Sequence, residues 1–368
     1  MSVEALSNCG PKTLGGQFLR RYWQPFARVG DLAEQSARRV QLLGEHFTFL
    51  QLEGGEHALL ADRCAHRGMP LCVGAVDGRG VRCAYHGWHF DARGACTDAP
   101  GESDTFRAGV GIRSLPLRHA LGLWFAYLGP GEAPTFPYAE LDLTGLATFR
   151  FAPIAWPCHF MLRVENTADV SHIGGVHRTS GLSAFLPQPY SLVVADHDYG
   201  FQLEVWSTEE RRGHPLRFFP PNAFQYRQPL LEGEPWMDHL TWHVPVDDHN
   251  TCTWTVVLVP TRDPAQFART NPEPTASDVE VVRKAQQILA GTSSFEALRN
   301  HPNLTEIEDC VAVCGQELAG GATPSNLGVC DAGITALRTL LSQRVQAFAE
   351  EGVVKPLGSL AQVIPSRE

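Results

Sequence analysis

Two cysteine–histidine pairs stand close together in the N-terminal third of the sequence. They are Cys64-x-His66 and Cys83-x-x-His86, with sixteen residues between them. A structural zinc site is one explanation, but zinc fingers usually supply their ligands as one pair of cysteines and one pair of histidines. Here each short segment supplies one residue of each kind. This arrangement suits a [2Fe–2S] cluster in which two thiolates bind one iron and two neutral imidazoles bind the other.

Glycines support this interpretation and lead to a family resemblance. Gly68, Gly87 and Gly94 allow tight turns, so that backbone N–H groups can approach the sulfur atoms. The segments CAHRG (64–68) and CAYHGW (83–88) resemble the two ligand loops of the Rieske iron–sulfur domain. Because both loops agree and the gap between them is suitable, the sequence favours a Rieske cluster over zinc.

A second group of metal-binding residue types lies in VENTADVSHIGGVH, residues 164–177. Glu165, Asp169 and His172 fall at i, i+4 and i+7, on one face of a helix. His177 is five residues beyond His172, which turns about 140° on an ideal helix. Two imidazoles on one ion therefore require a break between them, which we expect at Gly174-Gly175. The alternative is a helix with two ordinary polar histidines.

Two histidines and one carboxylate form the facial triad of non-haem Fe(II) oxygenases. A Rieske domain followed by Glu-Asn-x-x-Asp-x-x-His-x4-His resembles the Rieske non-haem iron oxygenases, oxygenase (alpha) subunit. The likeness runs from LRRYWQPFARV to CDAGITALRTLL and is greatest to the phthalate-dioxygenase-like branch.

This resemblance implies roles for two carboxylates. In the family the third iron ligand is an Asp in a late Glu-Asp-x-x-Val pattern, which places the role on Asp309; Glu306 and Glu308 are alternatives. The simpler explanation is an acidic helix start, where carboxylates are favourable. The resemblance also implies that Asp169 bridges His86 of one subunit and His172 of the next; otherwise Asp169 caps a helix or makes a surface contact.

The pattern of hydrophobic and glycine residues predicts the strands and helices that must position these residues. Residues 38–63 are predicted as short strands with glycine turns, and 117–131 as a closing strand that ends at Gly129-Pro130. Alternating stretches between 185 and 260 predict antiparallel strands. Residues 277–292 and 332–350 predict helices.

The expected fold class is α+β. An N-terminal segment, 1–20, is expected to pack on the catalytic domain. It is followed by a Rieske [2Fe–2S] β-domain, 21–135, and a catalytic mononuclear iron domain, 136–368. The resemblance implies that the last is a helix-grip, START-like domain with an antiparallel sheet.

Composition excludes several classes of protein. The 368 residues are 43% hydrophobic and 19% charged, as in a globular protein, and the formal net charge of −10 argues against a general nucleic-acid binder. No apolar run reaches the length of a membrane span, and the N-terminus lacks the pattern of a secretory signal. Ten cysteines are scattered along the chain, which predicts free or metal-binding thiols and a cytoplasmic location.

The function implied by the resemblance is that of a terminal oxygenase. It would use O2 and NAD(P)H-derived electrons to hydroxylate or oxidatively demethylate a small, aromatic molecule, as a homotrimer or as stacked trimers. A separate reductase or ferredoxin is expected, because the chain lacks a G-x-G-x-x-G unit and plant-type ferredoxin spacing. The alternative functions are those of a Rieske enzyme for desaturation or cyclisation and of a non-catalytic electron carrier.

The substrate pocket is expected to be lined by residues within 185–260, where Glu204, Trp206 and Trp236 are candidates. A buried hydrophobic core explains the two tryptophans equally well.

Overall fold

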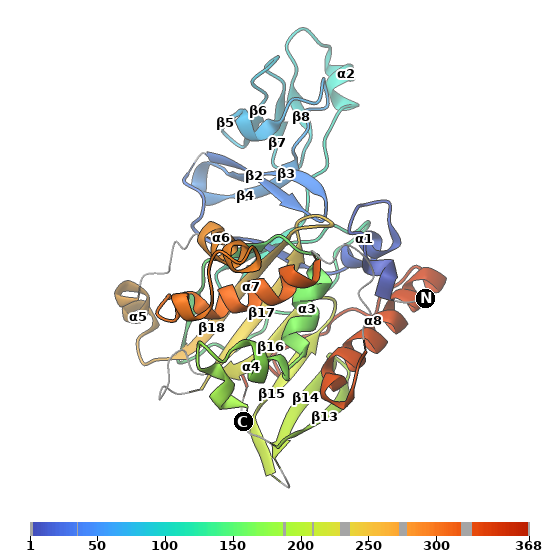
Figure 1. The fold of residues 1–368 in the computed structure, drawn as a ribbon. Helices are drawn as coiled ribbons and strands as arrows, with labels where there is room; N and C mark the ends of the chain where they lie inside the picture. Colours follow the sequence, from blue (N-terminus) through green and yellow to red (C-terminus); the bar gives the residue numbers. More distant parts are fainter. Residues whose placement is uncertain are drawn as a thin grey trace.

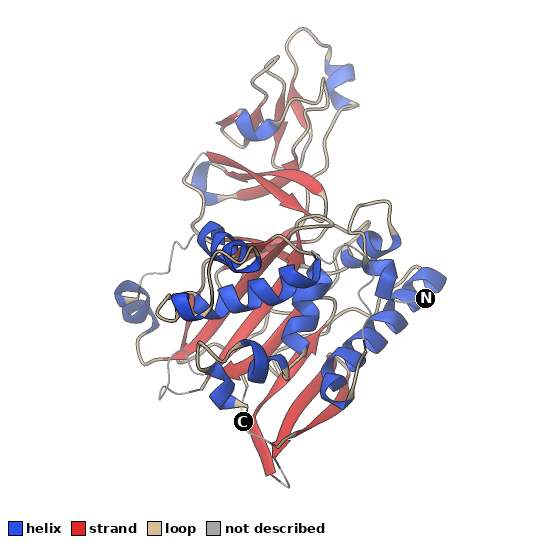
Figure 2. Ribbon diagram, viewed as in Figure 1, coloured by secondary structure: helices blue, strands red, loops and turns tan. Residues whose placement is uncertain are grey.

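The computed structural model describes residues 3–34, 36–186, 189–207, 210–228, 236–271, 278–317 and 326–366. Two lobes are visible in Figure 1: a smaller upper lobe of short strands and a larger lower lobe in which helices cover a long sheet. Figure 2 shows that strands dominate the upper lobe. No helix in these ranges is long and apolar enough to span a bilayer.

The N-terminal lobe contains three small antiparallel sheets. Their strand orders are β1-β10-β9, β2-β3-β4 and β5-β6-β7-β8. The bounds are β1 (Gln24–Arg28), β2 (Ser36–Leu42), β3 (Glu45–Gln51), β4 (His57–Ala61), β5 (Ala75–Asp77), β6 (Gly80–Arg82), β7 (His89–Asp91), β8 (Cys96–Asp98), β9 (Leu117–Ala120) and β10 (Leu123–Ala126). A short helix, α2 (Asp104–Ala108), follows β8.

The prediction of one closing strand over residues 117–131 was wrong in detail. The segment folds into a hairpin, with β9 paired to β10. Leu121 and Gly122 form the connection, and both have positive φ, 56° and 72°. Two such residues match the twist of the flanking strands.

The larger lobe is built on an antiparallel sheet. In the described residues its strand order is β11-β18-β17-β16-β15-β14-β13, and β12 also pairs with β18. The bounds are β11 (Leu146–Arg150), β12 (Ile154–Trp156), β13 (Ser191–His197), β14 (Gly200–Ser207), β15 (Glu210–Phe219), β16 (Ala223–Gln228), β17 (Met237–Pro245) and β18 (Thr251–Pro260). The strands predicted between 185 and 260 are present.

Helices lie over one face of this sheet (Figure 1). Along β17 the side chains alternate: His243 contacts Thr167 of α3 on the helix side, whereas Trp242 donates to the Tyr138 hydroxyl on the opposite side. Besides α2, the α-helices of the described residues are α1 (Leu14–Leu19), α3 (Phe160–Ala168), α4 (His172–Val176), α5 (Pro264–Thr270), α6 (Asp278–Leu289), α7 (Leu304–Glu317) and α8 (Ala332–Glu351).

The longest helix, α8, joins the N-terminal segment to the sheet. Leu337, Leu341, Val345 and Phe348 are buried at helical spacing, and Phe18 of α1 packs on Phe348 with ring centroids 5.9 Å apart. At the start of α8, a Cβ on Gly333 would lie 2.1 Å from the Ala168 carbonyl oxygen. The glycine therefore permits the close crossing of α3 and α8.

Buried hydrophobic side chains form separate cores. The main core joins the N-terminal segment, the β1-β10-β9 sheet, one face of the β2-β3-β4 sheet and the large sheet. A second, smaller core belongs to the upper lobe and includes Cys64, Cys83, Trp88 and Phe90. A third lies beneath α6 and α7. The cluster cysteines are thus held by a core of their own.

Candidate metal centres

The two Cys-His loops have the same backbone design. In the first, Cys64 N donates to Met69 O and Gly68 N donates to Cys64 O, both at 2.9 Å. In the second, Cys83 N donates to Trp88 O at 2.8 Å, and Gly87 N donates to Cys83 O at 3.1 Å. Gly68 and Gly87 have φ of 71° and 75°, a conformation that favours glycine. Equivalent turns therefore present one cysteine each.

Within this design the cysteines point inward and the histidines outward. Cys64 and Cys83 are 4% and 3% exposed, whereas His66 and His86 are exposed. The two imidazole rings lie together, with centroids 4.5 Å apart, and the Trp88 ring stacks on His66 at 4.6 Å and 6°. The tryptophan thereby fixes the orientation of one imidazole.

The donor set fits a [2Fe–2S] cluster. Burial raises the pKa of the Cys64 thiol, while backbone N–H groups of His66 and Arg67 favour its thiolate. Two buried cysteines, one of which receives backbone hydrogen bonds at its sulfur, suit the inner iron, and the exposed imidazole pair suits an outer iron.

The second candidate centre begins where α3 ends. The expected break at Gly174-Gly175 was wrong: these glycines lie inside α4, and the chain instead leaves the helix after Ala168 and again at His177. Tertiary contacts hold the first break open. Ser171 Oγ donates to Cys330 O at 2.8 Å and accepts from the Tyr190 hydroxyl at 2.8 Å.

The structure brings His172, His177 and Asp309 together. The two Nε2 atoms are 3.2 Å apart, and Asp309 Oδ1 lies 3.5 Å from His172 Nε2 and 3.3 Å from His177 Nε2. Three ligands about 2.1 Å from one ion, on one face of an octahedron, lie about 3 Å apart. The three atoms therefore have the spacing of a facial triad. Among the described residues they are the group of this kind that could hold a metal ion.

The hydrogen bonds of the two Nδ1 atoms determine that the Nε2 atoms of His172 and His177 can bind a cation. His172 Nδ1 contacts the carbonyl oxygen of Asp169, and His177 Nδ1 lies 2.9 Å from Glu308 Oε2. Both partners are acceptors, so each Nδ1 carries the proton and each Nε2 presents a lone pair. Two lone pairs and a carboxylate oxygen converge, and a metal ion would satisfy all three.

Glu308 itself lies outside the triad. Its side chain is fully buried, and it accepts from Ser180 N at 3.2 Å and Ser180 Oγ at 2.6 Å as well as from His177. Sequence reasoning considered Glu308 only as an alternative ligand. Its position one residue before Asp309 gave no sign that it orients His177.

Arg163, on α3 and nine residues before His172, was missed by the sequence reasoning. The residue is 6% exposed, and its guanidinium lies over Trp156 at 4.0 Å and approaches Asp309 Oδ2 at 3.5 Å. Burial opposes ionisation of Asp309, but the Arg163 charge and the rings of His172 and His177 hold the pKa of Asp309 well below its usual range. With Oδ2 beside Arg163, Asp309 turns Oδ1 toward the two histidines, where it also accepts from Asn166 Nδ2 at 3.4 Å.

Comparison with known proteins agrees with this pair of centres. The Rieske [2Fe-2S] domain family matches residues 22–116. The oxygenase subunit of 5,5'-dehydrodivanillate O-demethylase from Sphingobium sp. (strain NBRC 103272 / SYK-6) is 29% identical over 349 residues, which cover 91% of this chain and 77% of the relative. The chain belongs to the Rieske non-haem iron oxygenases.

Solved structures of Rieske oxygenases share the fold. The terminal oxygenase of carbazole 1,9a-dioxygenase from Nocardioides aromaticivorans IC177 has a TM-score of 0.69 at 20% identity, with 94% of this chain and 96% of that chain covered. A reduced complex between oxygenase and ferredoxin in carbazole 1,9a-dioxygenase has a TM-score of 0.68 at 18% identity, with 95% and 96% covered. These likenesses establish the α+β fold with an N-terminal Rieske domain.

In this Rieske oxygenase Asp169 contacts the His172 ring through its backbone carbonyl and not through its carboxylate. We expected its carboxylate to accept from the His172 ring; instead its carbonyl does so, and Oδ1 accepts from the His172 backbone N–H at 3.2 Å. Burial raises the pKa of Asp169, although His172 opposes this. His86 of the same chain lies between β6 and β7 in the upper lobe, far from α4 in Figure 1.

The candidate pocket residues on β14 do not face the triad of this Rieske oxygenase. Leu203 packs toward Gly333 of α8, so its neighbour Glu204 lies on the other side of the sheet. There Glu204 accepts from the indole of Trp206 at 3.1 Å. Trp236 precedes β17, and its carbonyl accepts from Arg227 at 2.6 Å.

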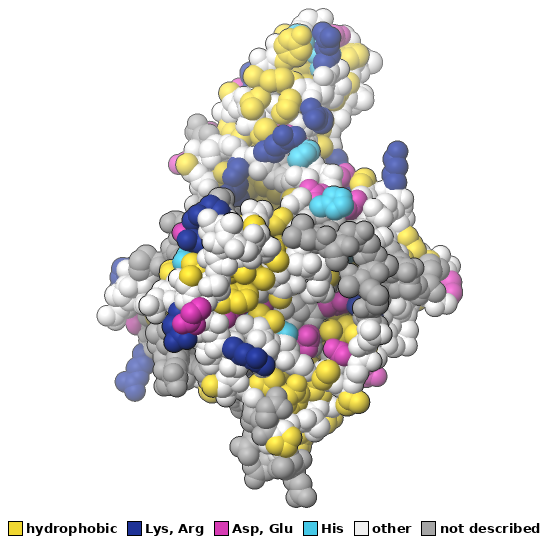
Figure 3. All heavy atoms as spheres, viewed as in Figure 1, with side chains coloured by type: hydrophobic (Ala, Val, Ile, Leu, Met, Phe, Trp, Pro, Cys, Tyr) yellow, Lys and Arg dark blue, Asp and Glu magenta, His cyan; other side chains and the backbone are white. Residues whose placement is uncertain are grey.

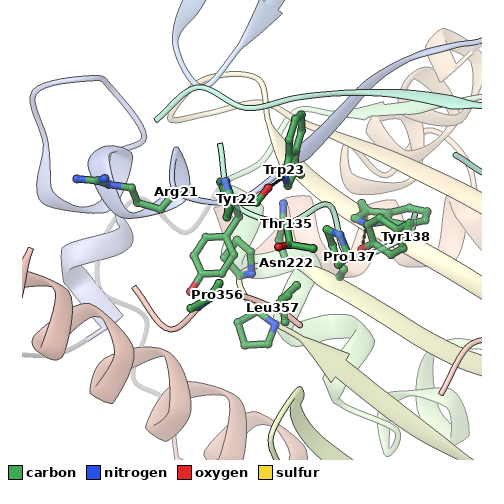
Figure 4. Close-up of a pocket in the computed structure, with 14 residues that line it drawn as sticks. Arg21, Tyr22, Trp23, Thr135, Pro137, Tyr138, Asn222, Pro356 and Leu357 are labelled. Atoms are coloured by element: carbon green, nitrogen blue, oxygen red, sulfur yellow. Dashed lines mark hydrogen bonds between the residues drawn. The ribbon is translucent and has the colours of Figure 1, made fainter. Parts of the chain in front are cut away.

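One cavity away from both centres is shown in Figure 4. It is lined by Tyr22, Trp23, Tyr138, Asn222 and Leu357, among others, and its volume is about 20 Å³. This is about the space that one water molecule needs, so the cavity is too small for an organic substrate.

Proposed function

We propose that this Rieske oxygenase is the terminal component of a system that hydroxylates or oxidatively demethylates a small, aromatic molecule. The observation that carries the proposal is the presence of two metal-binding arrangements in one chain. An electron carrier would need the Cys-His loops alone and would leave the convergence of His172, His177 and Asp309 unexplained. A [2Fe–2S] cluster supplies one-electron storage and a mononuclear Fe(II) supplies O2 activation.

The chain's own residues have defined tasks in this proposal. Cys64, Cys83, His66 and His86 hold the cluster, and His172, His177 and Asp309 hold the mononuclear iron. Glu308 and the Asp169 carbonyl keep both imidazoles in the tautomer that can bind a metal.

Metal analysis of two variants tests the assignment. The wild-type protein should contain three irons per chain. His177→Ala should retain two irons and the red-brown colour, because the cluster loops are in the other lobe. Cys83→Ser should lose the colour but keep the mononuclear site. Zinc as the only bound metal after anaerobic purification with iron and sulfide, or three irons in His177→Ala, would contradict the proposal.

Electrons should reach the cluster from a separate protein, such as a reductase or ferredoxin that draws on NAD(P)H. Two exposed hydrophobic side chains accompany the imidazoles: the Tyr85 ring lies against His86, and Phe106 contacts Trp88, whose ring stacks on His66. Figure 3 shows hydrophobic side chains gathered on the upper lobe. Such a surface suits contact with another protein chain.

We further propose a head-to-tail homotrimer, or stacked trimers, in which the cluster of one subunit serves the iron of the next. The separation of the two centres within one chain supports this arrangement (Figure 1). A heterologous contact that closes gives a ring. A stable, active monomer in sedimentation experiments would refute it. The cytoplasmic location stays a prediction.

Asp169→Asn tests the link between subunits. The single oxygen of an amide can still accept from the His172 backbone N–H. It leaves no second acceptor oxygen for His86 of the neighbouring subunit, which a carboxylate has. Both centres should remain loaded, while electron transfer from reduced cluster to iron slows by orders of magnitude. If Asp169 serves only as a cap, we expect a stability loss of about 1 kcal/mol and near-normal transfer.

A further inference from the structure

The sheet face beneath the metal-binding helices is polar. Tyr226 on β16 and Thr241 on β17 have hydroxyl oxygens 3.4 Å apart, and Thr241 lies 3.1 Å from Thr255 on β18. Farther along β17, the two ring nitrogens of His243 contact Thr167 at 2.8 Å and Thr253 at 2.9 Å. These polar groups satisfy one another, as buried polar groups normally do.

His239, on the same face of β17, is the exception. The residue is 2% exposed, and its Nε2 atom has no hydrogen-bond partner in the described part of the chain. The ring stacks on Tyr226, with centroids 5.3 Å apart and planes at 13°, and lies near Phe151 at 6.5 Å. Aromatic neighbours on two sides hold the imidazole in place.

The other nitrogen of this ring is engaged. The ring forms a hydrogen bond with the backbone of Gln228 that favours its protonated form, so the backbone carbonyl is the acceptor. Because Nε2 is unpartnered, this bond uses Nδ1–H. In the neutral ring Nε2 then presents a lone pair, which can only accept.

The unpartnered atom lies in the neighbourhood of the candidate iron site. Tyr226, which stacks on the ring, is partly exposed at the residue level, and desolvation of its hydroxyl raises its pKa; the charges of Arg163 and Asp309 also act on this hydroxyl. Tyr226 is therefore within electrostatic reach of the triad. His239 stands next to it, on the side of the sheet that faces α3.

We propose that His239 Nε2 is a substrate-recognition site that accepts a hydrogen bond from a neutral hydroxyl on the aromatic substrate. The inference rests on the proposed function, because it assigns the buried polar face as the substrate's binding surface. It names the substrate class as phenols. An aromatic N–H could make the same bond.

Charge argues against a carboxylate at this position. Burial lowers the pKa of His239 to about 4, so the ring is neutral near pH 7. A carboxylate would meet a lone pair where it needs a donor. Protonating the ring to supply that donor would place a charge in a buried aromatic environment, which is unfavourable.

Binding measurements on the iron-loaded protein test the proposal. The probes are 2-, 3- and 4-methoxyphenol against methoxybenzene, which differ only in the hydroxyl. Anaerobic calorimetry should show at least one methoxyphenol binding roughly 10-fold more tightly than methoxybenzene, the effect of one buried hydrogen bond. His239→Phe should reduce this preference to within about 2-fold.

Gln225→Leu is the matched control. Gln225 is buried on the neighbouring strand but faces the other side, where it donates to Asp238 at 3.0 Å. This variant should lose stability and keep the phenol preference. No preference in the wild-type protein, or an unchanged preference in His239→Phe, would overturn the proposal.

A crystal structure of the wild-type complex keeps the test decisive if His239→Phe does not fold. The phenol oxygen should lie within hydrogen-bond distance of His239 Nε2; a water molecule alone on that atom, with the phenol elsewhere, would overturn the proposal. Because binding is measured without turnover, the two proposals can fail separately. A chain that binds phenols through His239 but incorporates no oxygen refutes only the proposed function.

Discussion

Replacing Glu308 by glutamine should weaken iron binding without touching a ligand. The carboxylate is fully buried and receives three hydrogen bonds: Oε2 accepts from His177 Nδ1 and Ser180 Oγ, and Oε1 accepts from Ser180 N. A glutamine has one acceptor oxygen and one amide NH2 group, so it cannot accept all three.

Each orientation of the new side chain has a cost. If its oxygen replaces Oε2, the NH2 group faces the Ser180 N–H and one buried donor is lost, at about 1–3 kcal/mol. If the amide is reversed, its NH2 group faces His177 Nδ1. The imidazole must then carry its proton on Nε2, where it cannot bind a metal. Iron loading forces the first orientation, so we expect Fe(II) affinity to fall roughly 10- to 100-fold.

Competition with a chelator under anaerobic conditions measures this affinity. The visible absorbance of the cluster provides an internal standard, because its loops lie in the other lobe. Glu306→Gln is the control: the residue is on the same helix, two positions earlier, and its substitution should change the affinity by less than about 2-fold. An unchanged affinity in Glu308→Gln would refute the reasoning. A loss confined to Glu306→Gln would transfer the role to that residue.

Two further predictions concern stability. Gly333→Ala should cost about 1–3 kcal/mol in chemical denaturation, because its Cβ would overlap the Ala168 carbonyl; Gly315→Ala inside α7, where the nearest contact is an ordinary 3.4 Å, should be neutral or slightly stabilising. The pKa of His239 is lowered by burial from 6.5 to about 4, so between these values the unfolded chain binds a proton that the folded chain does not. Stability should therefore fall as pH is lowered through this window, by about 3 kcal/mol in all from this group. His239→Phe should lack that part of the pH dependence, and equal slopes in both proteins would contradict it.

Features that depend on contacts between neighbours in the sequence could be predicted, whereas features that depend on distant contacts could not. Cys64, His66, Cys83 and His86 could be grouped from sequence because their loops are local turns that repeat the same hydrogen bonds. The break before His172 could not be placed. It depends on Ser171, whose partners Tyr190 and Cys330 are 19 and 159 residues away.

Asp309 was identified only through resemblance, since nothing local distinguishes it from Glu306 and Glu308. The distinction comes from packing. Asp309 faces the two histidines and Arg163, whereas Glu308 turns to the far side of the His177 ring. An acidic helix start is visible in sequence, but which carboxylate reaches which atom is decided by how α7 lies on α3.

The separate core of the upper lobe has a consequence for biosynthesis. All four cluster residues lie between positions 64 and 86, within a lobe whose core is built from residues 37 to 112. The mononuclear site instead joins His177 to a helix 131 residues farther along. As the chain leaves the ribosome, the first lobe can fold and receive its cluster while the iron-binding helix α7 has yet to be synthesised. This order of synthesis allows the cluster to be loaded before the mononuclear site has formed.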